Sequence, residues 1–386
     1  MNILFYMPTV LIGGVRTVTE ILSKGFRERG HNVKWLLLYR IYGDERDFPE
    51  NEDLTYLPSR NLLSSDNINF YESFVSQNNI DIVINQNGAF DGVKLIDSIN
   101  NTHVKRISVI HNNPTFQLKW LFKDALTLRG NTIQEHFKRI ARIILYPRTL
   151  RNFKLNLKNH YNTLIQGNSH INVLSPSYID SVISINSRIH NISAIANPNT
   201  YTDTIVRKKE NIVLFVGRLD NRAKKINELV SIWRKATKYA PSWKLIIVGE
   251  GPDKNNLQKM SRDIPTIEFS GYQNPKSYYS RASILCMTSL FEGFPMTITE
   301  AMQHGCVPIA YDSFPAIHDI IKNGYDGIIV KAFNRKSYIK SLIGLIKEPD
   351  KLKSMSDNAI QNIQRFNRDI IIDQWESLII SLNNNE

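Results

Sequence analysis

Short, continuous apolar runs rich in Val, Ile and Leu recur along the chain, and they constrain its fold more than any other feature. The runs cover residues 2–6, 33–38, 80–84, 106–110, 211–216, 244–248, 267–269, 284–287 and 307–310. A strand that is covered on both faces is apolar throughout, as in parallel sheets. Amphipathic stretches lie between the runs. The alternation therefore predicts a doubly wound α/β architecture.

The alternation pauses once, at the polar stretch 196–210, which is rich in Pro, Asn and Lys. The chain has 386 residues, more than twice a typical domain of about 150. We expect a first Rossmann-like domain at 1–200, a linker at 201–210 and a second Rossmann-like domain at 211–366, with a cleft between the two. The apolar spacing within 367–386 predicts a C-terminal helix that either closes the second domain or packs back on the first.

The chain has an excess of basic residues, which suggests an anionic binding partner. The chain has 48 Lys and Arg against 36 Asp and Glu, a net charge of +12. Residues 118–160 hold ten Lys or Arg and two acidic residues, interleaved with apolar residues at helical spacing. Such a stretch predicts contact with an anionic membrane surface. The alternative is an apolar face in the core and a basic face in water.

Other classes of protein fit the sequence less well. Nucleic-acid binding remains a remote alternative, because zinc-finger spacing, helix-turn-helix cues and aromatic RNP-type strands are all missing. With only Cys286 and Cys306, a disulfide framework and a thiolate zinc site are excluded, and two small buried side chains in a reducing cytosol are expected. The apolar N-terminus reads as a first strand instead of a signal peptide. No apolar run is long enough to span a membrane.

Two places in the first half could meet an anion or a substrate. Gly13 and Gly14 lie between the first strand and a helix that should end at Gly30, where backbone N–H groups could approach a phosphate. A tight turn is the alternative, and without a full G-x-G-x-x-G a dinucleotide-dependent oxidoreductase is disfavoured. His111 follows a strand end and is either a site residue or a hydrogen-bonded loop histidine.

In the second half, cations and glycines follow the strand ends. Arg218 comes after Gly217 at the end of a strand, and Lys224 lies shortly before a helix, so both should lie at the carboxyl edge of a sheet. A guanidinium and an ammonium can neutralise a diphosphate. Three further residues could line a base pocket or could belong only to turns: Gly249, Gly251 and Tyr272.

A pair of carboxylates eight residues apart is the most specific pattern. Glu292 should lie in a loop before a helix, with Glu300 about two turns inside that helix. Gly293 leaves the neighbouring backbone N–H groups open to a ligand. A carboxylate accepts two vicinal hydroxyl groups, which suits a sugar and a ribose.

These motifs, in this order, resemble family 4 retaining glycosyltransferases of the GT-B fold. The resemblance rests on Gly217-Arg218-Leu219, Lys224, Gly249-Glu250-Gly251, Glu292-Gly293-Phe294-Pro295 with Glu300 (E-x7-E), and Asn323-Gly324-Tyr325-Asp326-Gly327. It implies that Arg218 and Lys224 hold the diphosphate. The hexose would meet Glu292 and the amides of Gly293 and Phe294, with Pro295 in the same binding loop, and the ribose would meet Glu300. In the first domain, Gly13 and Gly14 would face the phosphate and acceptor, with His111 near the reacting centre.

The resemblance also implies the activity. We expect metal-independent transfer of a hexose or N-acetylhexosamine, with retention, from a nucleotide-diphosphate sugar, by preference a UDP-sugar. The acceptor would be a glycan or a lipid-linked glycan in bacterial surface polysaccharide synthesis, and the enzyme would work in the cytoplasm at the inner face of the cell membrane. An inverting GT-B transferase and a sugar-nucleotide epimerase remain alternatives. The chain has Lys224-Lys225 where the family often has Lys-Gly, which leaves open which lysine meets phosphate, and Asp319 where Glu is more usual.

Overall fold

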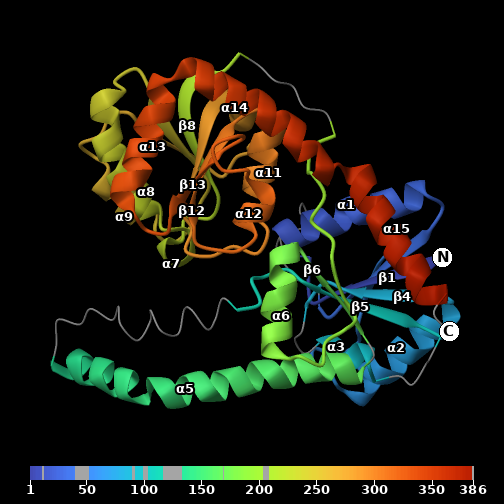
Figure 1. Ribbon diagram of the computed structural model, residues 1–386. Coiled ribbons are helices and arrows are strands. Elements are labelled where there is room, and N and C mark those ends of the chain that lie inside the picture. Colours follow the sequence, from blue (N-terminus) through green and yellow to red (C-terminus); the bar gives the residue numbers. More distant parts are fainter. Residues whose placement is uncertain are drawn as a thin grey trace. The chain divides into compact units, whose positions relative to one another are not determined.

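The chain forms two compact units. The computed structural model describes residues 1–10, 13–39, 52–88, 92–98, 103–115, 133–167, 169–202 and 208–384. Unit 1 comprises Met1–Ala196 with Ile372–Glu386, and unit 2 comprises Asn197–Ile371 (Figure 1). No helix of the described residues is long and apolar enough to cross a membrane.

Unit 1 is built on a parallel sheet of seven strands in the order β3-β2-β1-β4-β5-β6-β7. The strands are β1 (Asn2–Met7), β2 (Asn32–Leu37), β3 (Leu54–Tyr56), β4 (Ile82–Asn85), β5 (Lys105–Ile110), β6 (His170–Val173) and β7 (Ile192–Ala194). The helices of its main segment are α1 (Gly14–Glu28), α2 (Ser65–Gln77), α3 (Gly92–Ile96), α5 (Ile133–Gln166), the short 3-10 turn η2 (Pro176–Tyr178) and α6 (Ile179–Ile185). In the central register, Phe5 of β1 lies between Trp35 of β2 and Ile84 of β4.

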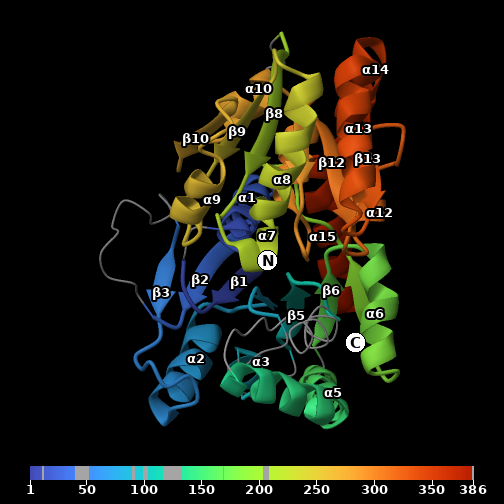
Figure 2. The same cartoon turned by 90° about the vertical axis from the view of Figure 1, so that its left-hand side faces the viewer.

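Unit 2 has a parallel sheet of six strands in the order β10-β9-β8-β11-β12-β13. They are β8 (Glu210–Val216), β9 (Lys244–Val248), β10 (Ile267–Gly271), β11 (Ala282–Met287), β12 (Val307–Asp312) and β13 (Ile328–Lys331), and Figure 2 shows β8, β9 and β10 side by side. The helices are α7 (Asn221–Lys224), α8 (Ile226–Ala236), η3 (Thr237–Tyr239), α9 (Lys254–Met260), α10 (Lys276–Arg281), α11 (Met296–Gln303), α12 (Ile317–Ile320), α13 (Arg335–Lys347), α14 (Pro349–Asn362) and η4 (Ile363–Phe366).

The predicted doubly wound architecture is confirmed in both units. Each of the nine apolar runs forms a strand, and each strand pairs in parallel with its neighbours. Four strands were not predicted from the sequence, and each has only three or four residues: β3, β6, β7 and β13. Three of them lie at a sheet edge, where one side needs no cover, and β6 and β7 contain polar residues. Short strands of this kind leave no continuous apolar run to recognise.

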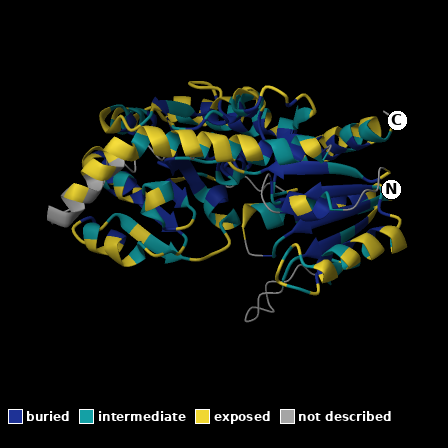
Figure 3. Ribbon diagram, turned by 90° about the horizontal axis from the view of Figure 1, so that it is seen from below, coloured by how far each residue is buried: buried dark blue, intermediate teal, exposed yellow. Residues whose placement is uncertain are grey.

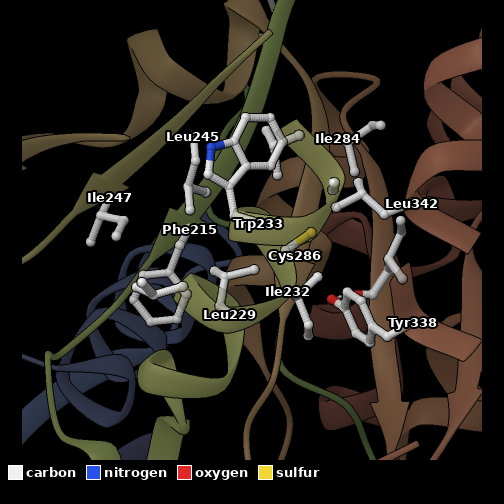
Figure 4. Close-up of a cluster of buried hydrophobic side chains, with 14 of the residues drawn as sticks. Phe215, Leu229, Ile232, Trp233, Leu245, Ile247, Ile284, Cys286, Tyr338 and Leu342 are labelled. Carbon is white, nitrogen blue, oxygen red and sulfur yellow. Dashed lines mark hydrogen bonds between the residues drawn. The ribbon is translucent and has the colours of Figure 1, made fainter. Parts of the chain in front are cut away.

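The core of unit 2 lies between its sheet and the helices α8 and α13. Trp233 is fully buried there and donates from its indole nitrogen to Thr266 Oγ1 at 3.0 Å. Cys286 lies in the same cluster, on the strand β11, close to Tyr338 (Figure 4). Both cysteines are free and buried, as predicted. Buried residues are concentrated on the strands of both sheets (Figure 3).

The C-terminal helix α15 (Arg368–Asn384) begins in unit 2 and ends in unit 1. In unit 1 it packs on α1: a Cβ atom on Gly25 would lie 2.5 Å from Ile372 Cδ1, so the two helices approach closely. The Arg29 guanidinium contacts Asp373 and Glu376, each at 2.6 Å. Helix α1 ends at Glu28 with Arg29 as its C-cap, so Gly30 is the residue just past the helix, as predicted, and it has φ of +81°.

Candidate functional site

The strand order defines where each unit can hold a ligand. In both sheets the order reverses between two neighbouring strands, β1 and β4 in unit 1 and β8 and β11 in unit 2. Ligands of open α/β sheets bind outside the carboxyl ends of the strands at this switch point. Arg218 and Lys224 lie in the segment between β8 and α8, Lys224 as the last residue of α7, and Glu292 lies in the loop after β11. Three of the predicted site residues therefore lie at the switch point of unit 2.

Lys224 and Glu292 form an ion pair that joins these two loops. The distance from Lys224 Nζ to Glu292 Oε1 is 2.6 Å, and the side chains are 25% and 13% exposed. The pair is thus shielded from bulk water but still reachable by a ligand. Of the two consecutive lysines, Lys224 is the one that reaches Glu292.

The backbone around Lys224 is held in place by the loop after β11. Thr288 Oγ1 lies 3.0 Å from the carbonyl oxygen of Lys224 and 3.1 Å from that of Lys225. The amide of Leu290 donates to the carbonyl of Ala223 at 2.7 Å. Lys225 has φ of +51° and ψ of +41°, a left-handed conformation in which glycine is the ordinary residue. The Lys-Gly pattern of the resembling family therefore has a steric reason, and Lys225 occupies the position with strain.

Arg218 and the glycines after β8 and β9 have different roles. Arg218 is exposed, and its guanidinium has neither a hydrogen bond nor an ion pair with the part of the chain that the structure describes. Gly249 has φ of +142°, and a Cβ atom there would lie 2.0 Å from the carbonyl oxygen of Gly217. A Cβ on Gly251 would lie 2.5 Å from that of Leu219. These glycines allow close backbone packing of the two loops. Tyr272 is 68% exposed after β10.

Glu300 lies in a network of its own. Helix α11 begins only at Met296, so Glu300 is little more than one turn inside it, and the expectation of two turns was wrong. Its Oε1 accepts from Thr200 Oγ1 at 2.8 Å and its Oε2 from Tyr279 Oη at 2.9 Å. Burial raises the pKa of this carboxyl, and the two hydroxyl donors act in the opposite direction. A ribose at Glu300 would have to share or replace these donors.

In the loop between Glu292 and α11, the backbone is more available to a ligand than the side chains are. Phe294 is 7% exposed and packs edge-on against Phe366, with ring centroids 5.3 Å apart. Pro295 is the N-cap residue of α11. Gly293 directly precedes Phe294 and has no side chain to contact a ligand. Phe294 therefore anchors the loop and is not free to contact a sugar with its ring.

In unit 1, His111 directly follows β5. Its Nε2 lies 2.6 Å from Oε1 of Gln86, the residue that follows β4. Burial lowers the pKa of His111 to about 4, so the imidazole is neutral at physiological pH. Gly13 is the N-cap residue of α1, and a Cβ atom there would meet none of the described residues within 4 Å. Gly14 is the first residue of α1.

Residues outside the predicted set also shape these sites. Gln86, Thr288, Thr200 and Tyr279 each contact a predicted site residue or its backbone. Gln86 directly follows β4 and Thr288 directly follows β11. Their positions right after strands at the two switch points could have marked them as site residues from the sequence. Thr200 and Tyr279 carried no comparable signal.

The basic segment 118–160 is described only from Ile133 onward; residues 118–132 lie outside the described residues. Helix α5 carries six large apolar side chains that are exposed, at 42–70%: Phe137, Ile140, Ile143, Ile144, Leu145 and Leu155. Exposed residues run along α5 in Figure 3. Nearer the end of the helix, Tyr161 and Leu164 are buried. The exposed apolar side chains show that the alternative of a purely core-facing apolar stripe does not hold for this part of α5.

Comparison with solved structures identifies the fold of the chain. The chain has the GT-B fold: it superposes on lipopolysaccharide outer core galactosyltransferase WaaB (TM-score 0.73, 19% identity, 99% of this chain and 100% of that one). It also superposes on Anabaena Alr3699/HepE, solved in complex with UDP-glucose (TM-score 0.72, 16% identity, 99% and 100%).

The sequence comparisons find glycosyltransferases among the similar proteins. Residues 201–362 match the family model described as Glycosyl transferases group 1. A Haemophilus influenzae protein described as an uncharacterized glycosyltransferase is 26% identical over 248 residues, 59% of this chain and 70% of that one. A Campylobacter jejuni α-1,4-N-acetyl-D-galactosaminyltransferase, which acts on a diNAcBac-PP-undecaprenol glycan, is 26% identical over 51% of this chain and 56% of its own length. The chain thus has glycosyltransferase homologues and the GT-B fold.

Proposed function

We propose that the protein is a retaining glycosyltransferase that moves a hexose or N-acetylhexosamine from a nucleotide-diphosphate sugar to a glycan or lipid-linked acceptor. A UDP-sugar is the expected donor, and bacterial surface polysaccharide synthesis is the expected setting. The observation that carries the proposal is the Lys224–Glu292 ion pair at the switch point of unit 2, with Nζ and Oε1 2.6 Å apart. The pair puts an ammonium group and a carboxylate together at the edge where an α/β sheet holds its ligand, which supports a site for a diphosphate and a sugar.

The proposed roles follow from charge. When the bond between the sugar C1 and the diphosphate breaks, negative charge grows on the leaving group, and preorganised cations stabilise it. Lys224 and the exposed Arg218 would supply those cations. Glu292 would accept hydrogen bonds from sugar hydroxyl groups, and it already orients Lys224 before the donor binds. The proposal includes metal independence and membership of glycosyltransferase family 4.

A donor screen tests the proposal. The purified protein is incubated with UDP- and GDP-sugars, and nucleotide release is measured with and without chelator. We expect release from one donor class, unaffected by chelator, and a product with the donor's anomeric configuration. An inverted product would favour the inverting GT-B alternative. Release from no donor would contradict the proposal.

We further propose that α5 binds the anionic inner face of the cell membrane, near a lipid-linked acceptor. Phe137, Ile140 and Ile144 are spaced by three and four residues and share one face of the helix, and all three are exposed. Four exposed cations follow on the same helix: Arg148, Arg151, Lys154 and Lys158. An exposed apolar face flanked by cations suits the boundary between lipid headgroups and acyl chains.

Liposome flotation tests this second proposal. The double variant Phe137→Ser, Ile144→Ser should lose binding to vesicles that contain phosphatidylglycerol, whereas the wild type binds them and ignores purely zwitterionic vesicles. Ile380→Ser is the matched control, because Ile380 is also an exposed apolar residue, at 49%, on a different helix. Equal indifference of the wild type to both kinds of vesicle would overturn the assignment.

A further inference from the structure

Gln86 is a buried amide at the switch point of unit 1 that the sequence patterns did not reveal. It follows β4 directly and is 4% exposed. Its backbone amide donates to the carbonyl of Tyr6 on β1 at 2.9 Å, which ties it to the neighbouring strand. A primary amide has two donor hydrogens and an acceptor oxygen, and a buried one is expected to use both.

One half of this amide is occupied by His111. Oε1 of Gln86 lies 2.6 Å from Nε2 of His111. Because an amide oxygen only accepts, the imidazole must donate through Nε2–H. The second ring nitrogen, Nδ1, then carries the lone pair of the neutral ring. The contact therefore selects one tautomer of His111.

The other half of the amide has no partner in the described parts of the chain. Nε2 of Gln86 is buried and has no hydrogen-bond partner among the described residues. Thr9 Oγ1 and Arg16 Nη1 are likewise buried without a partner in the described part of the chain, and both residues follow β1, the strand next to β4. The amide and the guanidinium are donors, so a ligand that completes them must offer oxygen acceptors. Hydroxyl groups of a sugar and oxygens of a phosphate have this chemistry.

We propose that Gln86 positions His111 in its Nε2–H tautomer and donates from its own Nε2 to an oxygen of the substrate that enters at the β1–β4 edge. The proposal rests on the proposed glycosyltransferase function. It assigns His111 the role of a neutral acceptor through Nδ1, not that of a cation. The substrate oxygen belongs either to an acceptor hydroxyl group or to the donor phosphate.

Two variants separate the two contacts. Gln86→Glu keeps an acceptor for His111 Nε2–H but removes the amide donor, whereas Gln86→Leu removes both. Gln77→Leu is the control, because Gln77 is exposed at the end of α2 in the same unit. Thermal unfolding confirms that each variant folds.

The first readout is the tautomer, followed by ¹⁵N NMR of histidine-labelled protein. We expect the Nε2–H form for His111 in the wild type and in Gln86→Glu, and a mixture of tautomers in Gln86→Leu. The second readout is kinetic. Gln86→Glu should raise the KM of one substrate about tenfold, the scale of one lost hydrogen bond, with little change in kcat, and Gln86→Leu should lower kcat as well. A change in the acceptor KM identifies a hydroxyl group, and a change in the donor KM identifies phosphate.

Two results would overturn the inference. One is an Nδ1–H tautomer of His111 in the wild type, and the other is a Gln86→Leu variant whose tautomer and kinetic constants match those of Gln77→Leu. If the wild type transfers no sugar at all, the proposed function fails and the substrate contact fails with it. The NMR result still decides separately whether Gln86 sets the tautomer of His111.

Discussion

Replacing Lys225 with glycine should stabilise unit 2 and leave sugar transfer intact. Lys225 has φ of +51° and ψ of +41°, between α7 and α8. A residue with a Cβ atom pays about 1–2 kcal/mol in this conformation. Glycine avoids that cost but loses about 0.5–1 kcal/mol through the greater freedom of the unfolded chain. The difference between these two ranges spans about 0–1.5 kcal/mol, and pairing their low ends and their high ends gives an expected net gain in the free energy of unfolding of about 0.5–1 kcal/mol. The hydrogen bond from Thr288 Oγ1 to the carbonyl of residue 225 does not depend on the side chain.

Calorimetry and denaturant titration of the full chain measure this effect. For a unit of this size, about 1 kcal/mol raises Tm by about 2–4 °C, so the expected rise is about 1–4 °C. Asn79→Gly is the matched control: Asn79 has φ of +47°, but asparagine tolerates this region, so no gain is expected. A Lys225→Gly variant that unfolds more easily, or one that loses transferase activity, would refute the strain argument and the assignment of Lys224 as the phosphate-side lysine.

Three further outcomes are expected. Arg218→Ala and Lys224→Ala should each lower the turnover number about 10²-fold or more, because a charge-stabilising donor is lost; wild-type turnover in both would refute the phosphate assignment. Tyr279→Phe should lower the free energy of unfolding by about 1–3 kcal/mol, since the buried Glu300 carboxylate loses a donor at 2.9 Å; an unchanged denaturation midpoint would contradict that contact. The pKa of His111 is about 4, below its ordinary value of 6.5, so its stabilising effect is present above pH 6.5 and is lost as the pH falls toward 4. Between pH 7.5 and 5.5 that loss is about 1 kcal/mol, and His111→Asn should remove it; equal pH slopes for variant and wild type would argue against a buried neutral histidine.

Much of the fold could be predicted because a parallel strand that is covered on both faces appears in the sequence as a continuous apolar run. The run 244–248 can be recognised as a buried strand from its own residues alone, and it forms β9. The edge strand β7 has only three residues and depends on β6 for its place, so local pattern could not reveal it.

The candidate site was predictable to the extent that its residues follow strand ends. Lys224 and Glu292 meet because β8 and β11 are neighbours in the sheet. The sequence placed Lys224 after a strand end and Glu292 in a loop before a helix, but it did not show that the two strands lie side by side. The partners of Glu300 could not be predicted in this way. Thr200 is 100 residues away in sequence and Tyr279 is 21 residues away, and only the packing of their segments brings them to Glu300. The exposed apolar side chains of α5 also needed the structure, because helical spacing alone does not say which side of a helix is covered.

The most direct test of the central claim is nucleotide release from a panel of nucleotide sugars by three proteins: the wild type, Lys224→Ala and Lys225→Gly. We expect the wild type to release the nucleoside diphosphate from one donor class. We expect about 10²-fold slower release by Lys224→Ala and near wild-type release by Lys225→Gly. Equal rates in the wild type and Lys224→Ala, or release from no donor at all, would contradict a nucleotide-sugar site at the Lys224–Glu292 pair.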